Sequence, residues 1–282
     1  MTIGVTGASG GVGSRVVRRL LDLVHGAPVV ALTRTPEAVP EQPGLTARHA
    51  DYEDRSSLLA SMRGVDTLVF ISSDGVADPV RRHHANIVSA AIEAGVEHIV
   101  YTSILDVSPD SAFYYAPLHR ETEAMLVDAG LGCSLARTSI FADYFASAWV
   151  TPALADGDLA LPAATGRMSL VTRHDVARAL AALAVERLPA IFELTGPAAL
   201  TAAEICEFTR ATTGRELSYS AIDEPSYRDL MARDRAPDWL IEAYSSMWTS
   251  VREGRFETVS ADVRGLTGAP QQSYADFLAA EP

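Results

Sequence analysis

Residues 2–17 read Thr2-Ile3-Gly4-Val5-Thr6-Gly7-Ala8-Ser9-Gly10-Gly11-Val12-Gly13-Ser14-Arg15-Val16-Val17, and this stretch decides the fold that we expect. Its first part is short, apolar and β-branched, which predicts a buried strand. Its last part continues to Val24 with apolar residues at helical spacing, which predicts an amphipathic helix. The glycines between the two allow a tight strand-to-helix turn, because glycine accepts positive φ and close backbone approach.

This glycine turn has the properties of a pyrophosphate site. The N–H groups at the start of the helix are exposed, and the helix dipole favours an anion beside them. The glycines recur as Gly7-x-x-Gly10-x-x-Gly13, a variant of the commoner dinucleotide-binding spacing. We therefore expect the turn residues to bind a dinucleotide cofactor: Gly7, Ala8, Ser9, Gly10, Gly11, Val12 and Gly13.

The same turn also has the G-x-S-x-G pattern of the nucleophile elbow in α/β-hydrolases, with Ser9 as the candidate nucleophile. Both motifs predict a strand, a turn and a helix, so the local pattern does not separate them. In a hydrolase, earlier strands precede the elbow and one of them supplies the oxyanion loop. Here the turn follows the first predicted strand, which favours dinucleotide binding.

Strands and helices alternate from this turn to residue 137. Further strands are expected at 28–33, 45–50, 66–71, 98–103 and 133–137. Asp54 and Asp78 are candidate helix N-caps, and Gly95 is a candidate helix stop. Short connections between alternating elements predict an α/β fold, a Rossmann-type doubly wound parallel sheet.

After Thr138 the pattern becomes irregular, which predicts a smaller, mostly helical C-terminal lobe over the carboxyl ends of the strands. Ligands bind at those ends in open α/β sheets. We expect an NADP-binding Rossmann domain over residues 1–155 and a substrate-binding lobe over residues 156–282. The strand at 191–195 is expected to join the main sheet.

Composition limits the function classes. The 282 residues are 48% hydrophobic, as in a folded core, and carry a formal net charge of -13, which disfavours nucleic acids and anionic membrane surfaces as partners. Apolar runs are too short for a membrane span. Cys133, Cys206 and the histidines lack disulfide or metal-site spacing, so no metal is expected. A first strand directly after Met1 favours a cytoplasmic protein.

Arg34 ends the second predicted strand, beside the adenosine ribose in this type of fold. An acidic residue there binds the 2′-hydroxyl of NAD, whereas an arginine favours the 2′-phosphate of NADP. Asp51 ends the third predicted strand and is a candidate partner for the adenine amino group, or a loop residue that starts a turn.

Small polar residues end the next two predicted strands, Ser72 and Ser73 on one and Ser103 on the other. The carboxyl ends of these strands face the crevice where a cofactor binds. All three serines are candidate cofactor contacts, although serine is also common at ordinary strand ends.

Tyr115 and His119 lie four residues apart at the start of a predicted helix. In short-chain dehydrogenases a Tyr and a Lys at this spacing perform the acid/base chemistry, and His119 stands in place of the Lys. A histidine can hydrogen-bond the ribose, but at neutral pH it carries little positive charge unless its pKa is perturbed. Tyr115 and His119 are therefore candidate catalytic residues, with packing as the alternative role for Tyr115.

Taken together, these motifs resemble the NmrA-like group of atypical short-chain dehydrogenase/reductases, especially type 2 NAD(P)H:quinone oxidoreductases and triphenylmethane reductases. The similarity runs over nearly the whole chain. The segments that carry it are Thr6–Gly13, Val30–Pro36, Ala50–Tyr52, Ile71–Ser73, Tyr101–Ser103, His119–Glu123, Arg137–Phe141 and Leu194–Pro197.

The resemblance implies that NADPH binds across the glycine turn, with its nicotinamide near Ser139, Ile140 and Phe141. It implies reduction of a quinone or similar conjugated aromatic acceptor, which needs little general-acid help. Two alternatives remain open: a ketoreductase that uses Tyr115 and His119, and a non-catalytic NADP sensor. Aromatic and methionine residues of the second lobe suit a flat apolar ligand, or they pack its helices: Phe141, Tyr144, Phe145, Trp149, Tyr227, Met231, Trp239, Tyr244, Met247 and Trp248.

Overall fold

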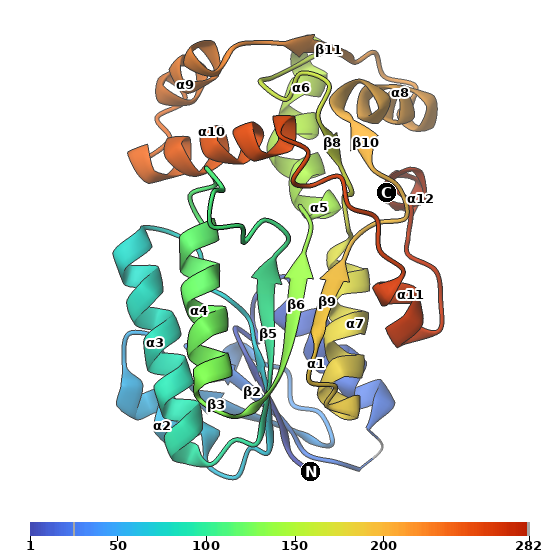
Figure 1. Cartoon of the computed structure of the whole chain (residues 1–282). Helices are drawn as coiled ribbons and strands as arrows, with labels where there is room; N and C mark the ends of the chain where they lie inside the picture. Colours follow the sequence, from blue (N-terminus) through green and yellow to red (C-terminus); the bar gives the residue numbers. More distant parts are fainter. Residues whose placement is uncertain (25, 281–282) are drawn as a thin grey trace.

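The computed structural model describes residues 1–24 and 26–280, and at its centre lies a sheet of seven parallel strands (Figure 1). Their order, β3-β2-β1-β4-β5-β6-β9, is that of a doubly wound Rossmann-type sheet and confirms the predicted fold class. The strands are β1 (Ile3–Thr6), β2 (Val29–Thr33), β3 (Leu45–His49), β4 (Thr67–Phe70), β5 (His98–Ile104), β6 (Gly132–Thr138) and β9 (Ile191–Leu194).

Helices cover both faces of this sheet, which is why its inner strands are almost continuously apolar. One face carries α2 (Arg55–Met62), α3 (Ala77–Ala94) and α4 (Ala116–Asp128). The other carries α1 (Gly13–Leu23), α7 (Arg173–Glu186) and α11 (Asp262–Thr267), as Figure 1 shows. A short 3-10 turn, η1 (Pro36–Ala38), follows β2.

Helix ends follow the predicted signals with one exception. Asp54 caps α2 by accepting hydrogen bonds from the N–H groups of Ser56 and Ser57. Gly95 ends α3 in the left-handed conformation, at φ 79°. Asp78 is not an N-cap, because α3 already begins at Ala77; its carboxylate lies in the first turn, where it complements the helix dipole.

The C-terminal lobe lies over the carboxyl ends of the strands (Figure 1). Its core packs Phe145, Trp248 and Phe256. The lobe contains α5 (Ala142–Phe145), the π-helical η2 (Ala146–Val150), α6 (Thr151–Asp156), β7 (Asp158–Leu161), β8 (Arg167–Met168), β10 (Leu200–Thr201), α8 (Ala202–Thr213), β11 (Ser218–Ala221), α9 (Glu224–Arg233), α10 (Asp238–Arg252) and α12 (Tyr274–Ala280).

The chain passes between lobe and sheet more than once. After α6 it returns to the sheet, where α7 packs beside α1 and β9 pairs with β6 as predicted. Residues 156–282 therefore contribute to the core of the sheet as well as to the lobe. Among residues 1–24 and 26–280, no helix combines the length and the apolar character needed to cross a membrane.

Candidate functional site

A cavity of about 1220 Å³ lies where the strand ends meet the C-terminal lobe. It exceeds the roughly 300–1000 Å³ typical of a single small ligand, so it has room for a dinucleotide and a second molecule. Most of the predicted site residues line it: Gly7, Ser9, Gly10, Gly11, Val12, Gly13, Arg34, Asp51, Ser72, Ser73, Tyr115, His119, Ser139, Ile140 and Phe141.

The glycine turn forms the floor of the cavity at one end. Gly7 has φ +58°, and its carbonyl accepts a 2.9 Å hydrogen bond from the N–H of Gly10. A Cβ on Gly13 would lie 2.2 Å from the oxygen of Gly7, so this position accepts no side chain. No side chain caps the start of α1, within the part of the chain that the structure describes. The N–H of Ser14 donates to the carbonyl of Gly10 at 3.0 Å, and the N–H groups of Gly11, Val12 and Gly13 are available to an anion instead.

The hydroxyl of Ser9 has a hydrogen-bond partner that cannot act as a general base. Its hydroxyl lies 2.9 Å from the hydroxyl of Thr33, which is not a base. The hydroxyl pair instead ties the glycine turn to the end of β2. This geometry favours the dinucleotide interpretation of the turn over a nucleophile elbow.

The adenosine end of the cavity combines an exposed cation with polar groups. Arg34 is exposed directly after β2. Asp51 follows β3; one of its carboxylate oxygens accepts a hydrogen bond from the N–H of Glu53 at 3.0 Å, and the carboxylate lines the cavity. Tyr52 and His83, which are not among the predicted site residues, complete this end with their rings edge to face.

A buried histidine fixes the loop that carries Ser72 and Ser73. The N–H of Ser73 donates to Nε2 of His84 at 3.2 Å, so the ring proton is on Nδ1, which donates to the hydroxyl of Thr122 at 2.8 Å. Burial lowers the pKa of His84 to about 4 and keeps it neutral. The N–H of Ser72 donates to the hydroxyl of Thr102 at 2.7 Å.

The segment after β6 forms the middle of the cavity. The N–H of Ser139 donates to the carbonyl of Leu194 at 3.0 Å, and its hydroxyl accepts from Ser169 at 3.1 Å. Ile140 and Phe141 follow, and Phe141 pairs with Val171 through an isolated bridge. These contacts tie the segment to both the sheet and the lobe.

Tyr115 and His119 both line the cavity, but each is already engaged. The Tyr115 hydroxyl accepts from the N–H of Gly75 at 3.0 Å and donates to its carbonyl at 3.3 Å, and burial raises its pKa well above the ordinary value. His119 pairs through Nδ1 with the hydroxyl of Tyr101 at 2.8 Å. Burial lowers the pKa of His119 to about 3, so it is neutral and supplies no charge to activate a phenol.

Two predicted cofactor contacts do not lie on the cavity wall. The Ser103 hydroxyl donates to the buried carboxylate of Glu123 at 2.6 Å, and the same carboxylate pairs with Arg137. Ser103 therefore stabilises the core between β5, β6 and α4, because its side chain points to α4. Ala8 is buried beneath the glycine turn.

The far end of the cavity is an aromatic wall. We use this name for the lining residues Tyr144, Trp149, Trp239, Tyr244 and Met247. Tyr144 and Tyr244 join through their hydroxyls, and Trp149 packs edge to face against both rings. Other residues predicted with this group pack the lobe core instead: Phe145, Tyr227, Met231 and Trp248.

The cavity lining outside the predicted set also includes Phe113, Arg173 and Phe256. Phe113 and Phe256 stack edge to face, one from the β5–α4 loop and one from the segment after α10. Arg173 is the first residue of α7. Phe113 lies two residues before Tyr115 but belongs to no recognised motif, and Arg173 and Phe256 lie far along the chain from the glycine turn, so the folded chain brings these two to the cavity.

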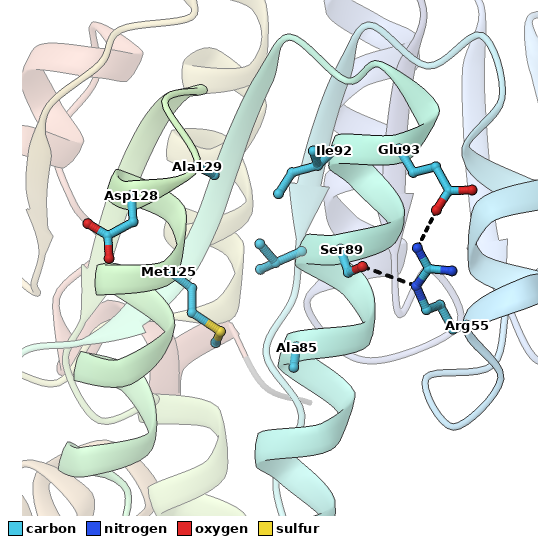
Figure 2. A pocket seen from close by; sticks show the side chains of 9 residues that line it. Arg55, Ala85, Ser89, Ile92, Glu93, Met125, Asp128 and Ala129 are labelled. Carbon is cyan, nitrogen blue, oxygen red and sulfur yellow. Dashed lines mark hydrogen bonds and ion pairs between the residues drawn. The ribbon is translucent and has the colours of Figure 1, made fainter.

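A second hollow, of about 570 Å³, opens between α3 and α4 (Figure 2). Its rim carries Arg55, which bonds Ser89 and pairs with Glu93, and its floor is formed by Met125 and other apolar groups. Arg55 is thus engaged by its neighbours. The hollow lies on the outer side of these helices, away from the strand ends, and none of the predicted site residues lines it.

The residues at the strand ends fit NADPH. An uncapped helix start above a glycine without room for a Cβ suits a pyrophosphate, and the exposed Arg34 suits the 2′-phosphate. Together, the glycine turn and the strand order define a Rossmann-type dinucleotide-binding protein.

Residues 1–262 match the NmrA-like family, and the chain belongs to this family. It is 32% identical to quinone oxidoreductase 2 of Escherichia coli strain K12 over 284 residues, 98% of this chain and 97% of that protein. It is 27% identical to the NAD(P)H azoreductase of Xenophilus azovorans, over 98% of this chain and 96% of that protein.

Among solved structures, the NADPH-dependent quinone oxidoreductase QOR2 of Escherichia coli, complexed with NADPH, superposes with a TM-score of 0.91. The two sequences are 29% identical, and the match covers 98% of each chain. These findings confirm the resemblance that the sequence motifs indicated. By class, the protein is an oxidoreductase.

Proposed function

We propose that this protein is an NADPH-dependent oxidoreductase that transfers hydride to a quinone or a similar conjugated aromatic acceptor. The observation that carries the proposal is the continuity of one cavity. It runs from Arg34 and the glycine turn, past Ser139 to Phe141, to the aromatic wall. An acceptor held flat against that wall would lie next to Ser139, Ile140 and Phe141, where we expect the nicotinamide.

The protein's own residues position the two reactants. The glycine turn and Arg34 would hold the phosphates of NADPH, which supplies the hydride when bound. Ser139, Ile140 and Phe141 are held by contacts with Leu194, Ser169 and Val171 and would orient the nicotinamide. The aromatic wall would orient the acceptor and exclude water. Such positioning supplies much of the rate in a reaction that needs no covalent help from the protein.

The state of Tyr115 and His119 favours an acceptor that needs no general acid. A quinone becomes a hydroquinone by taking a hydride from NADPH and a proton that water can supply at an oxygen. A ketone would draw more on an acidic side chain. Here the phenol of Tyr115 is bonded to Gly75 and has a raised pKa, and the imidazole of His119 is neutral. These observations count against the ketoreductase alternative.

A screen of NADPH oxidation tests the proposal. Simple quinones, triphenylmethane dyes and aromatic ketones would be offered in turn, with absorbance at 340 nm as the readout. We expect turnover with quinones and slower or no turnover with ketones. Faster turnover with ketones would favour the ketoreductase alternative. NADPH binding without turnover on any acceptor would contradict both enzymatic functions and favour the sensor.

A further inference from the structure

The guanidinium of Arg173 lies over the glycine turn. A Cβ added to Gly11 would be 3.3 Å from Nε and 3.4 Å from Cδ of Arg173, so the arginine side chain crosses the turn at its middle glycine. The absence of a side chain at Gly11 leaves room for this crossing. Arg173 lines the same cavity as the glycine turn and Arg34.

This arginine is held by its backbone and by aromatic rings. Its backbone N–H donates to Oδ2 of Asp143 at 2.8 Å, which anchors the start of α7. Its Cζ lies 5.1 Å from the ring centre of Phe141 and 5.7 Å from that of Tyr144, within cation–π distance. Across residues 1–24 and 26–280, no carboxylate lies within 4.0 Å of its guanidinium, so the N–H groups at its edge are available.

The neighbouring arginine differs in this respect. Arg15 donates to the carbonyl of Gly11 at 2.6 Å, lies 4.0 Å from the Asp143 carboxylate, and does not appear in the cavity wall. The sequence has no lysine. Among the described residues that line the cavity, the two arginines are therefore Arg34 and Arg173. NADPH likewise carries two phosphate groups, a 2′-phosphate and a diphosphate.

We infer that Arg173 binds the diphosphate of the cofactor, as a second cationic anchor opposite the uncapped start of α1. The inference rests on the cofactor of the proposed function, and it does not depend on the acceptor. A guanidinium matches a diphosphate well, because its planar fork donates two parallel hydrogen bonds to phosphate oxygens. From the first residue of α7, its side chain reaches the glycine turn at Gly11.

Binding of cofactor fragments tests this assignment without catalysis. Calorimetry would compare adenosine 2′-monophosphate, which lacks the diphosphate, with 2′-phospho-ADP-ribose, which carries it. We expect Arg173→Gln to weaken 2′-phospho-ADP-ribose and NADPH by ~10-fold or more, and to leave adenosine 2′-monophosphate within about twofold. Arg34→Ala should weaken both fragments. Arg233→Gln, on the exposed side of α9, controls for the loss of one positive charge.

Three results would overturn the assignment. The first is unchanged affinity of Arg173→Gln for 2′-phospho-ADP-ribose. The second is equal weakening of both fragments, which would indicate a general distortion of the site. The third is a raised KM for the acceptor with an unchanged Kd for NADPH, which would place Arg173 on the acceptor. If NADPH binds as expected but no acceptor is reduced, the proposed function fails while this assignment stands.

Discussion

Arg34 is an exposed side chain, and its proposed role is to bind the 2′-phosphate of NADPH. It lies directly after β2 and lines the cavity, and its carbonyl accepts a 3.2 Å hydrogen bond from Nδ1 of His49, which holds the backbone in place. Ser9 and Thr33 bond to each other beside it. In the part of the chain that the structure describes, Arg34 takes part in no ion pair, which leaves its charge for the ligand.

Replacing Arg34 by alanine should therefore change cofactor preference. We expect the Kd of NADPH to rise by ~10-fold, because a charged hydrogen bond to the 2′-phosphate is lost. The Kd of NADH should stay within about twofold. Titration of NADPH and NADH fluorescence measures both values. Equal losses for the two cofactors would refute the 2′-phosphate role.

The hydroxyl of Tyr115 bonds the loop before α3. Its hydroxyl bonds both backbone groups of Gly75, and the neighbouring Tyr114 hydroxyl accepts from the N–H of Ala77 at 2.8 Å. The two phenols together brace this loop. For Tyr115 the sequence left two roles open, catalysis and packing, and these contacts favour packing.

Tyr115→Phe should separate these roles. We expect kcat with a quinone to change by less than about threefold, and the thermal midpoint to fall because ~1 kcal/mol per lost hydrogen bond is removed. Tyr114→Phe is the matched control and should lower the midpoint similarly. A drop in the rate of ketone reduction of ~10²-fold, specific to Tyr115→Phe, would instead identify a general acid.

At the scale of elements, the strand-to-helix turn is constrained by close approach of its own backbone. Gly13 opens α1, where alanine would ordinarily be preferred to glycine by about 1 kcal/mol. The carbonyl of Gly7 reverses that preference, because it occupies the place of any Cβ at residue 13. At position 13, the contact with the Gly7 carbonyl therefore requires glycine although helix propensity alone would favour alanine.

Gly13→Ala should consequently open the turn and abolish tight NADPH binding, with a Kd raised by at least ~10-fold. Gly265→Ala is the control: it also lies in a helix, α11, but an added Cβ meets no atom within 4 Å there. This control should bind NADPH normally and be as stable as the parent or slightly more stable. Calorimetry and thermal unfolding measure both effects, and normal binding by Gly13→Ala would contradict the geometry of the turn.

At the scale of the whole molecule, three buried histidines link stability to pH. Burial lowers the pKa of His84 and His98 to about 4 and that of His119 to about 3. Their unfolded pKa is near 6.5. Between these values the unfolded chain binds protons that the folded chain does not, so acid favours unfolding.

We therefore expect the free energy of unfolding to be at its highest above about pH 6.5 and to fall as the pH drops toward 4. Each histidine contributes a slope of up to ~1.4 kcal/mol per pH unit. Urea unfolding at pH 7.5, 6.5, 5.5 and 4.5 measures this fall.

An aspartate acts at lower pH. The pKa of Asp110 is lowered to about 2, chiefly by its hydrogen bond to Arg255, so its contribution to stability is lost only below about pH 4.

His98→Gln provides the control for this slope. His98 bonds only inside the core, to Ser134 at 2.9 Å, and lies away from the cavity. The variant should show a shallower fall of stability between pH 6.5 and 4.5, whatever its stability at pH 7.5. A stability that stays constant over this range in the parent protein would contradict the link.

The sequence by itself determined the sheet and one end of the site. The strands and the residues that follow them could be recognised from local sequence, because strand burial, turn geometry and strand-end chemistry each depend on neighbouring residues. These residues are Gly7–Gly13, Arg34, Ser72 and Ser139. They were enough for the fold class, the return of 191–194 to the sheet, and the position of most of the cavity wall.

Only the tertiary structure decided which polar groups are free to act. Ser103 is engaged by Glu123, Tyr115 by Gly75 and His119 by Tyr101, and these partners are 18 to 40 residues away in the chain. Arg173 reaches the glycine turn across about 160 residues of sequence for the same reason. Hydrogen bonding and burial are properties of the folded neighbourhood, so residue spacing could not predict them.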